Sequence, residues 1–142
     1  MAENDITVQQ HAEVISKTAI FQSGIDYLRD SIQGLKYAIF ATDDGFPVAT
    51  TQMDLKEATR KAAMTASLDG LSKTVAHESE FSEAIATQVE CSDGFIFSRI
   101  VSLRQGLHVA LLVAARNGES LATIQWHIKK CASDVIEKFN QA

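Results

Sequence analysis

The chain has 142 residues and a formal net charge of -5 at pH 7, and 46% of its residues are hydrophobic and 22% are charged. This length fits one domain with a single core, and the composition is that of a globular protein rather than a disordered or membrane-embedded one. The thinly spread lysines and arginines exclude the basic stripe that would neutralise a row of phosphates, so nucleic acid is not an expected partner.

Compartment follows from the cysteines and from the absence of targeting signals. Cys91 and Cys131 are too few and too widely spaced for a disulfide framework, which favours a reducing environment. The first ten residues show no signal peptide, and no run reaches the roughly 18 apolar residues of a membrane span. We therefore expect a cytoplasmic protein without membrane insertion.

The N-terminal part predicts a lead-in followed by a helix. Residues 1–11 are polar and are expected to be a mobile segment, which leaves residues 12–142 as a single domain. Apolar positions then recur at alternating spacings of four and three, which is typical of one helical stripe; they are Val14, Thr18, Phe21, Ile25, Leu28 and Ile32. Gly34 follows, where a left-handed cap would end this helix.

The stretch YAIFATDDGFPVAT, residues 37–50, predicts a hairpin. Its first half is almost wholly apolar, which suits a strand buried on both faces. Asp43-Asp44-Gly45 supplies turn residues, because aspartate bonds its own backbone and glycine accepts positive φ. The second strand contains Pro47, which cannot donate to a ladder and therefore suits an edge strand or a strand's first residue.

Residues 53–79 predict a helix with two apolar sides. One stripe comprises Leu55, Ala58, Ala62 and Ala66, and the other, on roughly the opposite face, comprises Met64, Leu68, Leu71 and Val75. One side can cover a sheet. A single domain of this size has nothing left to cover the other, so this helix indicates a partner molecule.

Three strands and a last helix complete the chain. Residues 84–91 alternate, with Ile85, Thr87, Val89 and Cys91 on one face, and Ser92-Asp93-Gly94 repeats the Asp-Gly turn before a strand over 95–103. Arg104-Gln105-Gly106 makes a third turn into a central strand over 107–115. The helix over 120–140 carries a core stripe that leaves Trp126 on the opposite side; the stripe is Leu121, Ile124, Ile128, Cys131, Val135 and Phe139.

The predicted order is α-β-β-α-β-β-β-α, an α/β sandwich (α+β) with an antiparallel sheet. Three segments in this order resemble the Roadblock/dynein light chain family, in particular the bacterial single-domain members that regulate small Ras-like GTPases: GLKYAIFATDDGFPVAT, RKAAMTASLDGLSKTVAHE and SLATIQWHIKKCA. The resemblance covers residues 14–140. It implies a five-stranded sheet in the order 2-1-5-4-3, with the middle helix on one face and the terminal helices on the other. It also implies a homodimer through the third strand and the middle helix, with an interface at Met64, Leu68, Leu71, Ala86 and Gln88.

Candidate chemistry is sparse. Asp43 and Asp44 could ligate a cation, but calcium needs more oxygens than this loop supplies, so we interpret them as a turn. His127 and Cys131, four residues apart on a helix, could share a metal, although Cys131 already belongs to the core stripe. A Cys91 nucleophile would need a histidine that the sequence does not place beside it. We expect no catalytic residue, cofactor or metal.

The remaining histidines carry simpler expectations. His11 and His77 are expected to be solvated, and His108 to be a satisfied histidine within a core strand.

A charged cluster on the middle helix remains, formed by Lys56, Glu57, Arg60 and Lys61. It is either a solvated face with i, i+4 pairs or a contact surface for an acidic partner. Under the resemblance that partner is a small Ras-like GTPase. The leading hypothesis is a homodimeric regulator or scaffold of such a GTPase. Any stimulation of GTP hydrolysis is expected to come from ordering groups of the GTPase, because no catalytic residue is expected in this protein. A purely structural assembly subunit is the alternative, and a thiol or metal hydrolase is a distant one.

Overall fold

The computed structural model describes residues 11–142; residues 1–10, where most of the lead-in was predicted, lie outside the described part. A helical segment over residues 11–16 precedes α2, from which a turn at Lys17 separates it. The elements that follow are α2 (Thr18–Ser31), β1 (Leu35–Thr42), β2 (Pro47–Thr50), α3 (Leu55–Glu78), β3 (Ala86–Cys91), β4 (Gly94–Ser102), the short 3-10 helix η1 (Arg104–Gly106), β5 (His108–Arg116) and α4 (Leu121–Gln141). Among the described residues, no helix is long and apolar enough to cross a membrane.

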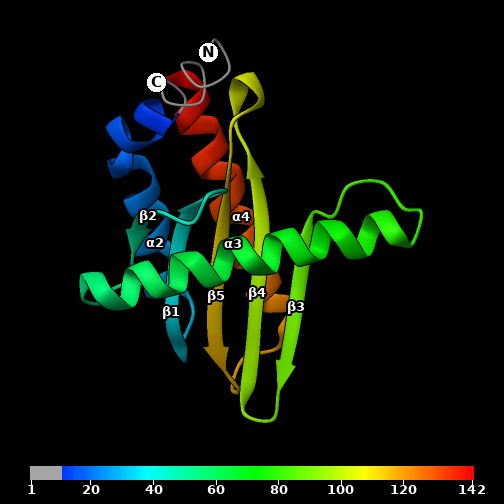
Figure 1. Ribbon diagram of the computed structural model, residues 1–142. Coiled ribbons are helices and arrows are strands. Elements are labelled where there is room, and N and C mark those ends of the chain that lie inside the picture. The colour runs from blue at the N-terminus through cyan, green and yellow to red at the C-terminus, as the bar shows by residue number, and fades with distance from the viewer. Residues whose placement is uncertain (1–10) are drawn as a thin grey trace.

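The five strands form one antiparallel sheet in the order β2-β1-β5-β4-β3. The long helix α3 crosses one face of this sheet, while α2 and α4 lie against the other face (Figure 1). The predicted fold class, strand order and placement of the helices are thereby confirmed.

The large core lies between the sheet and the α2/α4 layer. Phe21 of α2 packs edge-on against Phe40 of β1, with ring centroids 5.3 Å apart, and is 5.8 Å from the ring of Phe139 on α4. The two helices approach closely at Gly24, where an added Cβ would lie 2.8 Å from a methyl group of Val135. Glycine at this position therefore sets the distance between α2 and α4.

A smaller core lies between the sheet and α3. Ile39 and Ala41 of β1 point to this side, where they pack with Ala62 and Leu112, whereas Phe40 points to the large core. This alternation confirms that β1 is buried on both faces, as its apolar sequence predicted.

Glycines make the two hairpins possible. Gly45 adopts φ 91° in the β1–β2 turn, which the Thr42 N–H closes by donating to the Phe46 carbonyl at 2.8 Å. Gly94 opens β4, and a Cβ there would lie 2.3 Å from the carbonyl oxygen of Ala115. The second Asp-Gly turn thus requires glycine because the backbone of β5 passes too close for any side chain.

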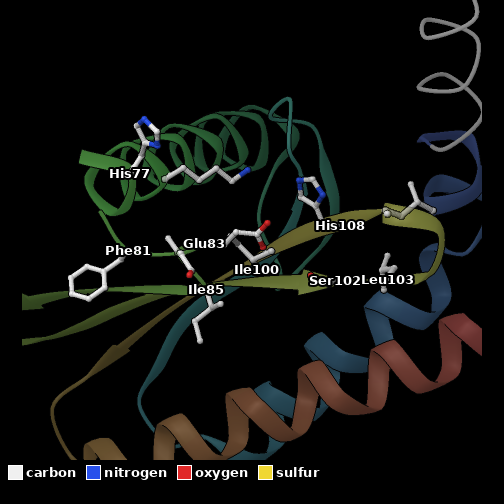
Figure 2. Close-up of a pocket in the computed structure, with 13 residues that line it drawn as sticks. His77, Phe81, Glu83, Ile85, Ile100, Ser102, Leu103 and His108 are labelled. Carbon is white, nitrogen blue, oxygen red and sulfur yellow. The ribbon is translucent and has the colours of Figure 1, made fainter. Parts of the chain in front are cut away.

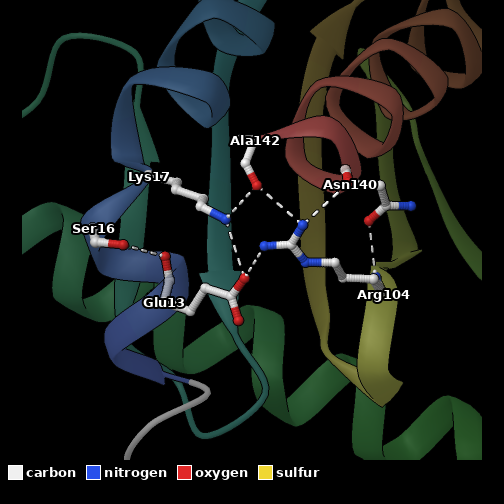
Figure 3. A network of polar contacts seen from close by, with 6 residues as sticks. All are labelled: Glu13, Ser16, Lys17, Arg104, Asn140 and Ala142. Atoms are coloured by element: carbon white, nitrogen blue, oxygen red, sulfur yellow. Dashed lines mark hydrogen bonds and ion pairs between the residues drawn. The ribbon is translucent and has the colours of Figure 1, made fainter.

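An ionic network joins the N-terminal helix, the β4–β5 turn and the end of α4 (Figure 3). The Arg104 guanidinium pairs with Glu13 and donates to the backbone oxygens of Asn140 and Ala142 at 3.1 and 3.0 Å. Lys17 also pairs with Glu13, at 3.1 Å. A hydrogen bond from Arg104, with a smaller contribution from that of Lys17, holds the pKa of the Glu13 carboxyl below its ordinary value. The network fixes the ends of the α2/α4 layer to the sheet.

Candidate interaction surface

The outer face of α3 is apolar and uncovered. Met64 is 49% exposed, Leu71 is 60% exposed and Val75 is 58% exposed, and these positions share one side of the helix. The two-sided pattern predicted from the sequence is therefore present, and the described chain covers only one of the two sides.

The inner face of α3 carries small and polar residues. Ala58, Ala62, Thr65 and Asp69 are buried against the sheet, and the Asp69 carboxylate pairs with Lys73 at 3.2 Å. This stripe differs from the predicted one, because the first helical residue, Leu55, is 77% exposed rather than directed at the sheet.

Leu68, assigned to the dimer interface, is half-buried within the chain itself. It packs against the small core, beside Ala62 and Leu112. Only part of its surface is left for a partner, so Met64, Leu71 and Val75 make up most of the open apolar stripe.

One of the two edge strands of the sheet is β3, whose single neighbour in the described sheet is β4. Ile100 donates its N–H to the Ile85 carbonyl, and the register pairs Ala86 with Arg99. Because bonded and non-bonded pairs alternate in an antiparallel ladder, the N–H and C=O groups of Ala86, Gln88 and Glu90 point away from β4. Ala86 and Gln88, both predicted for the dimer interface, thus present free backbone groups at this edge.

The apolar stripe of α3 and the β3 edge form one region of the surface. In Figure 1 the C-terminal part of α3 reaches past β3, and the chain then turns back into that strand. Phe81 and Ile85 lie in the segment that joins α3 to β3, and they are 79% and 64% exposed. Together with His77 and His108 they line a cavity of about 690 Å³ (Figure 2). The two ends of the predicted apolar face of β3, Ile85 and Cys91, are therefore exposed, whereas Thr87 between them is half-buried and contacts Ser72 of α3.

The charged cluster on α3 consists of one ion pair and two exposed cations. Glu57 and Lys61 bond each other at 2.6 Å, and the Lys61 ammonium also lies 4.7 Å from the ring centroid of Tyr37. Lys56 and Arg60 are exposed, and within residues 11–142 no ion pair holds either of them. Of the four predicted contact residues, these two are the cations available to a partner.

The structure directs His127 and Cys131, the predicted metal pair, to different partners. Cys131 is buried and its thiol donates to the Gly24 carbonyl at 3.4 Å, whereas His127 Nδ1 lies 2.7 Å from the Tyr27 hydroxyl. Burial, followed by the Asp134 charge, raises the pKa of the Cys131 thiol to about 12. Such a thiol stays protonated at neutral pH, so it offers neither a nucleophile nor a ready metal ligand.

One cluster was missed from the sequence. His11, expected to be solvated, is half-buried and places Nε2 3.5 Å from carboxylate oxygens of both Asp43 and Asp44. His108 reaches the same turn from β5, with Nε2 3.4 Å from Asp43 Oδ2. No local spacing could predict this meeting, because it depends on how the N-terminal helix packs beside the first hairpin.

Comparison with solved structures identifies the architecture. No protein-family model and no curated protein matches the sequence. The structure superposes on Myxococcus xanthus MglB with a TM-score of 0.75 at 17% identity, over 88% of this chain and 91% of that one. The chain has the Roadblock/LC7 fold.

Two further structures share the Roadblock/LC7 fold with this chain. A Roadblock/LC7 domain from Streptomyces avermitilis gives a TM-score of 0.73 at 16% identity, over 82% of this chain and 95% of that one. A structure described as MglB with a tetrameric arrangement gives 0.68 at 15% identity, over 85% and 93%. Each alignment spans nearly the whole of the matched chain, so the likeness concerns the complete fold.

Proposed function

We propose that the protein is a homodimeric regulator or scaffold of a small Ras-like GTPase, with no catalytic residue of its own. The observation that carries the proposal is the uncovered apolar stripe of α3 beside the open β3 edge. A partner that meets both would bury the apolar side chains and satisfy the free backbone groups at once. The tetrameric arrangement described for one MglB structure supports self-association of this fold.

In the proposed dimer, two β3 strands pair through their outward backbone groups. The outward groups belong to Ala86, Gln88 and Glu90, so a two-fold axis at Gln88 pairs Gln88 with its twin and Ala86 with the twin's Glu90. This register uses all of the outward groups named here. It also continues the sheet across the dimer and brings the two α3 helices to the same face.

The GTPase would then bind at the free cations of α3. Lys56 and Arg60 lie near the N-terminal end of α3, at the opposite end from the segment that joins α3 to β3. A paired α3 surface carrying two such sets suits an acidic patch on a globular partner, which it would attract by electrostatic steering. Ordering the partner's own catalytic groups requires no reactive side chain from this protein.

The experiment is a charge reversal with a matched control. Lys56→Glu with Arg60→Glu should weaken binding of a Ras-like GTPase from the same genome by about 1 kcal/mol or more per lost pair, mainly through the association rate and with steep salt dependence. Lys129→Glu with Lys138→Glu, an equal change of charge on exposed positions of α4, should leave binding unchanged. Equal weakening by both double variants would contradict a specific contact at α3.

Nucleotide preference separates the regulator from the assembly subunit. The GTPase is loaded with a non-hydrolysable GTP analogue and then with GDP, and the affinity of each form for the wild-type protein is measured. Tighter binding of one form supports a regulator, because a ligand shifts a switch only through its differential affinity for the two states. Equal affinity favours the structural assembly role, and a protein that binds neither form lacks the proposed function.

A further inference from the structure

We propose that the turn between β1 and β2 is a binding site for a divalent transition-metal ion of the zinc type, held by His11, Asp43 and Asp44. One ligand atom from each residue lies within 4.8 Å of the other two. The three residues come from the N-terminal helix and the hairpin turn, so the fold, rather than the local sequence, assembles the site. The proposal is independent of the proposed function, which concerns α3 and β3.

Two of the three distances between ligand atoms fit a tetrahedral ion, and the third, between the two carboxylates, is within 4.8 Å. With metal–ligand bonds of about 2.0–2.1 Å, the ligand atoms of a tetrahedral zinc site lie roughly 3.4 Å apart. His11 Nε2 lies 3.5 Å from Asp43 Oδ1 and 3.5 Å from Asp44 Oδ1. The imidazole is thus already at the spacing that a shared ion requires.

The charges also call for a cation. Two adjacent carboxylates meet here, and no lysine or arginine within residues 11–142 pairs with either of them. The basic side chains next to them are the imidazoles of His11 and His108. An ion of charge +2 would balance both carboxylates.

His108 gives a second observation that points to the same place. Its Nε2 atom is buried, has no hydrogen-bond partner among the described residues, and lies 3.4 Å from Asp43 Oδ2. Carboxylate ligands of metals are commonly oriented by outer donors, and this unpaired nitrogen lies near enough to Asp43 to act as one when an ion orients the carboxylate. Thr42 already orients the other carboxylate, because its hydroxyl donates to Asp44 Oδ1 at 2.7 Å.

The ligand types select the class of ion. Calcium and magnesium prefer sets made wholly of oxygen, whereas one imidazole with two carboxylates suits zinc, cobalt and related ions. Three protein ligands leave a fourth position for water. Binding would fasten the helical segment over residues 11–16 to the hairpin turn, with His108 of β5 supporting the turn from the sheet.

The test is calorimetric titration of the whole protein with Zn²⁺ in a Cys91→Ser background, which removes the exposed thiol as a competing ligand. We expect one ion per chain, and at least about a tenfold loss of affinity in His11→Ala, in the Asp43→Asn/Asp44→Asn double variant and, through the outer donor, in His108→Ala. His77→Ala changes a histidine of α3 outside the cluster, and this variant should bind Zn²⁺ as tightly as the Cys91→Ser parent. Calcium and magnesium should give no heat.

A second measurement needs no substitution in the site. The Cys91→Ser protein titrated with Co²⁺ should develop the strong visible absorption of a four-coordinate ion, and Zn²⁺ should displace it. The proposal is overturned if Zn²⁺ does not bind, if His11→Ala and the double aspartate variant bind as tightly as the parent, or if the cobalt spectrum stays that of the hydrated ion.

Discussion

Leu71 provides the sharpest test of the proposed dimer. It is 60% exposed, so the chain alone gains little from it. Burying a whole leucine stabilises by about 1.5–3 kcal/mol, so burying the exposed part adds about 1–2 kcal/mol per protomer and about 2–4 kcal/mol per dimer. Leu71→Glu loses this contribution and also places an unpaired charge in the apolar seam.

The assay is sedimentation velocity over a range of concentrations. A loss of about 2–4 kcal/mol raises the dimer dissociation constant between about 30-fold and about 1,000-fold. The fold should survive, because position 71 faces away from the sheet, and far-UV circular dichroism checks this. Leu55→Glu, at an exposed leucine on the other end of α3, is the matched control and should remain dimeric. A Leu71→Glu dimer as tight as the wild type, or a wild-type monomer at micromolar concentration, would refute the reasoning.

Three further predictions concern the edge strand, the second turn and the thiols. In a Cys91→Ser background, Gln88→Cys should form a disulfide with its twin, because directly bonded residues across the two-fold axis lie about 5.5 Å apart, whereas Thr87→Cys should not. Gly94→Ala should lower the free energy of unfolding by about 1–3 kcal/mol or more, measured by urea denaturation, because its Cβ would meet a β5 carbonyl oxygen at 2.3 Å. A thiol reagent at neutral pH should label Cys91 alone in the native protein and Cys131 only after unfolding, since burial raises the latter's pKa to about 12; rapid native labelling of both would contradict the buried environment.

Much of the fold could be predicted because its signals are local. The α4 stripe from Ile124 to Phe139 repeats at helical spacing, and those positions are buried. Ser120 caps this helix by accepting from the Thr123 N–H, as its residue type suggested. Turn residues such as Gly45 and Gly94 stand where the chain needs positive φ or a close backbone approach. Each signal acts within a few residues of sequence, so periodicity and turn chemistry are enough to find it.

The face of α3 that packs against the sheet could not be predicted in the same way. Alanines and other small residues occur around the helix, so hydrophobicity alone does not distinguish a stripe through Leu55 and Ala66 from one through Thr65 and Asp69. The sheet selects the second stripe, in which the buried Asp69 carboxylate still reaches Lys73 on the next helical turn. The cluster at Asp43 was missed for a different reason. Tertiary packing brings its histidines to the turn, and the local spacing of residues in the sequence does not reveal such a contact.

The inner stripe of α3 bears on why the outer one remains apolar. Large side chains such as Phe21, Leu28 and Phe139 fasten α2 and α4 to the sheet, whereas α3 buries Ala58, Ala62, Thr65 and Asp69. These small or polar residues remove little apolar surface from water, so one chain holds its longest helix weakly. The larger apolar side chains Met64, Leu71 and Val75 lie exposed on the outer face, where a second copy could bury them. In the proposed dimer, the second copy would complete the docking of α3 and thereby hold the cations Lys56 and Arg60 in a fixed position for a partner.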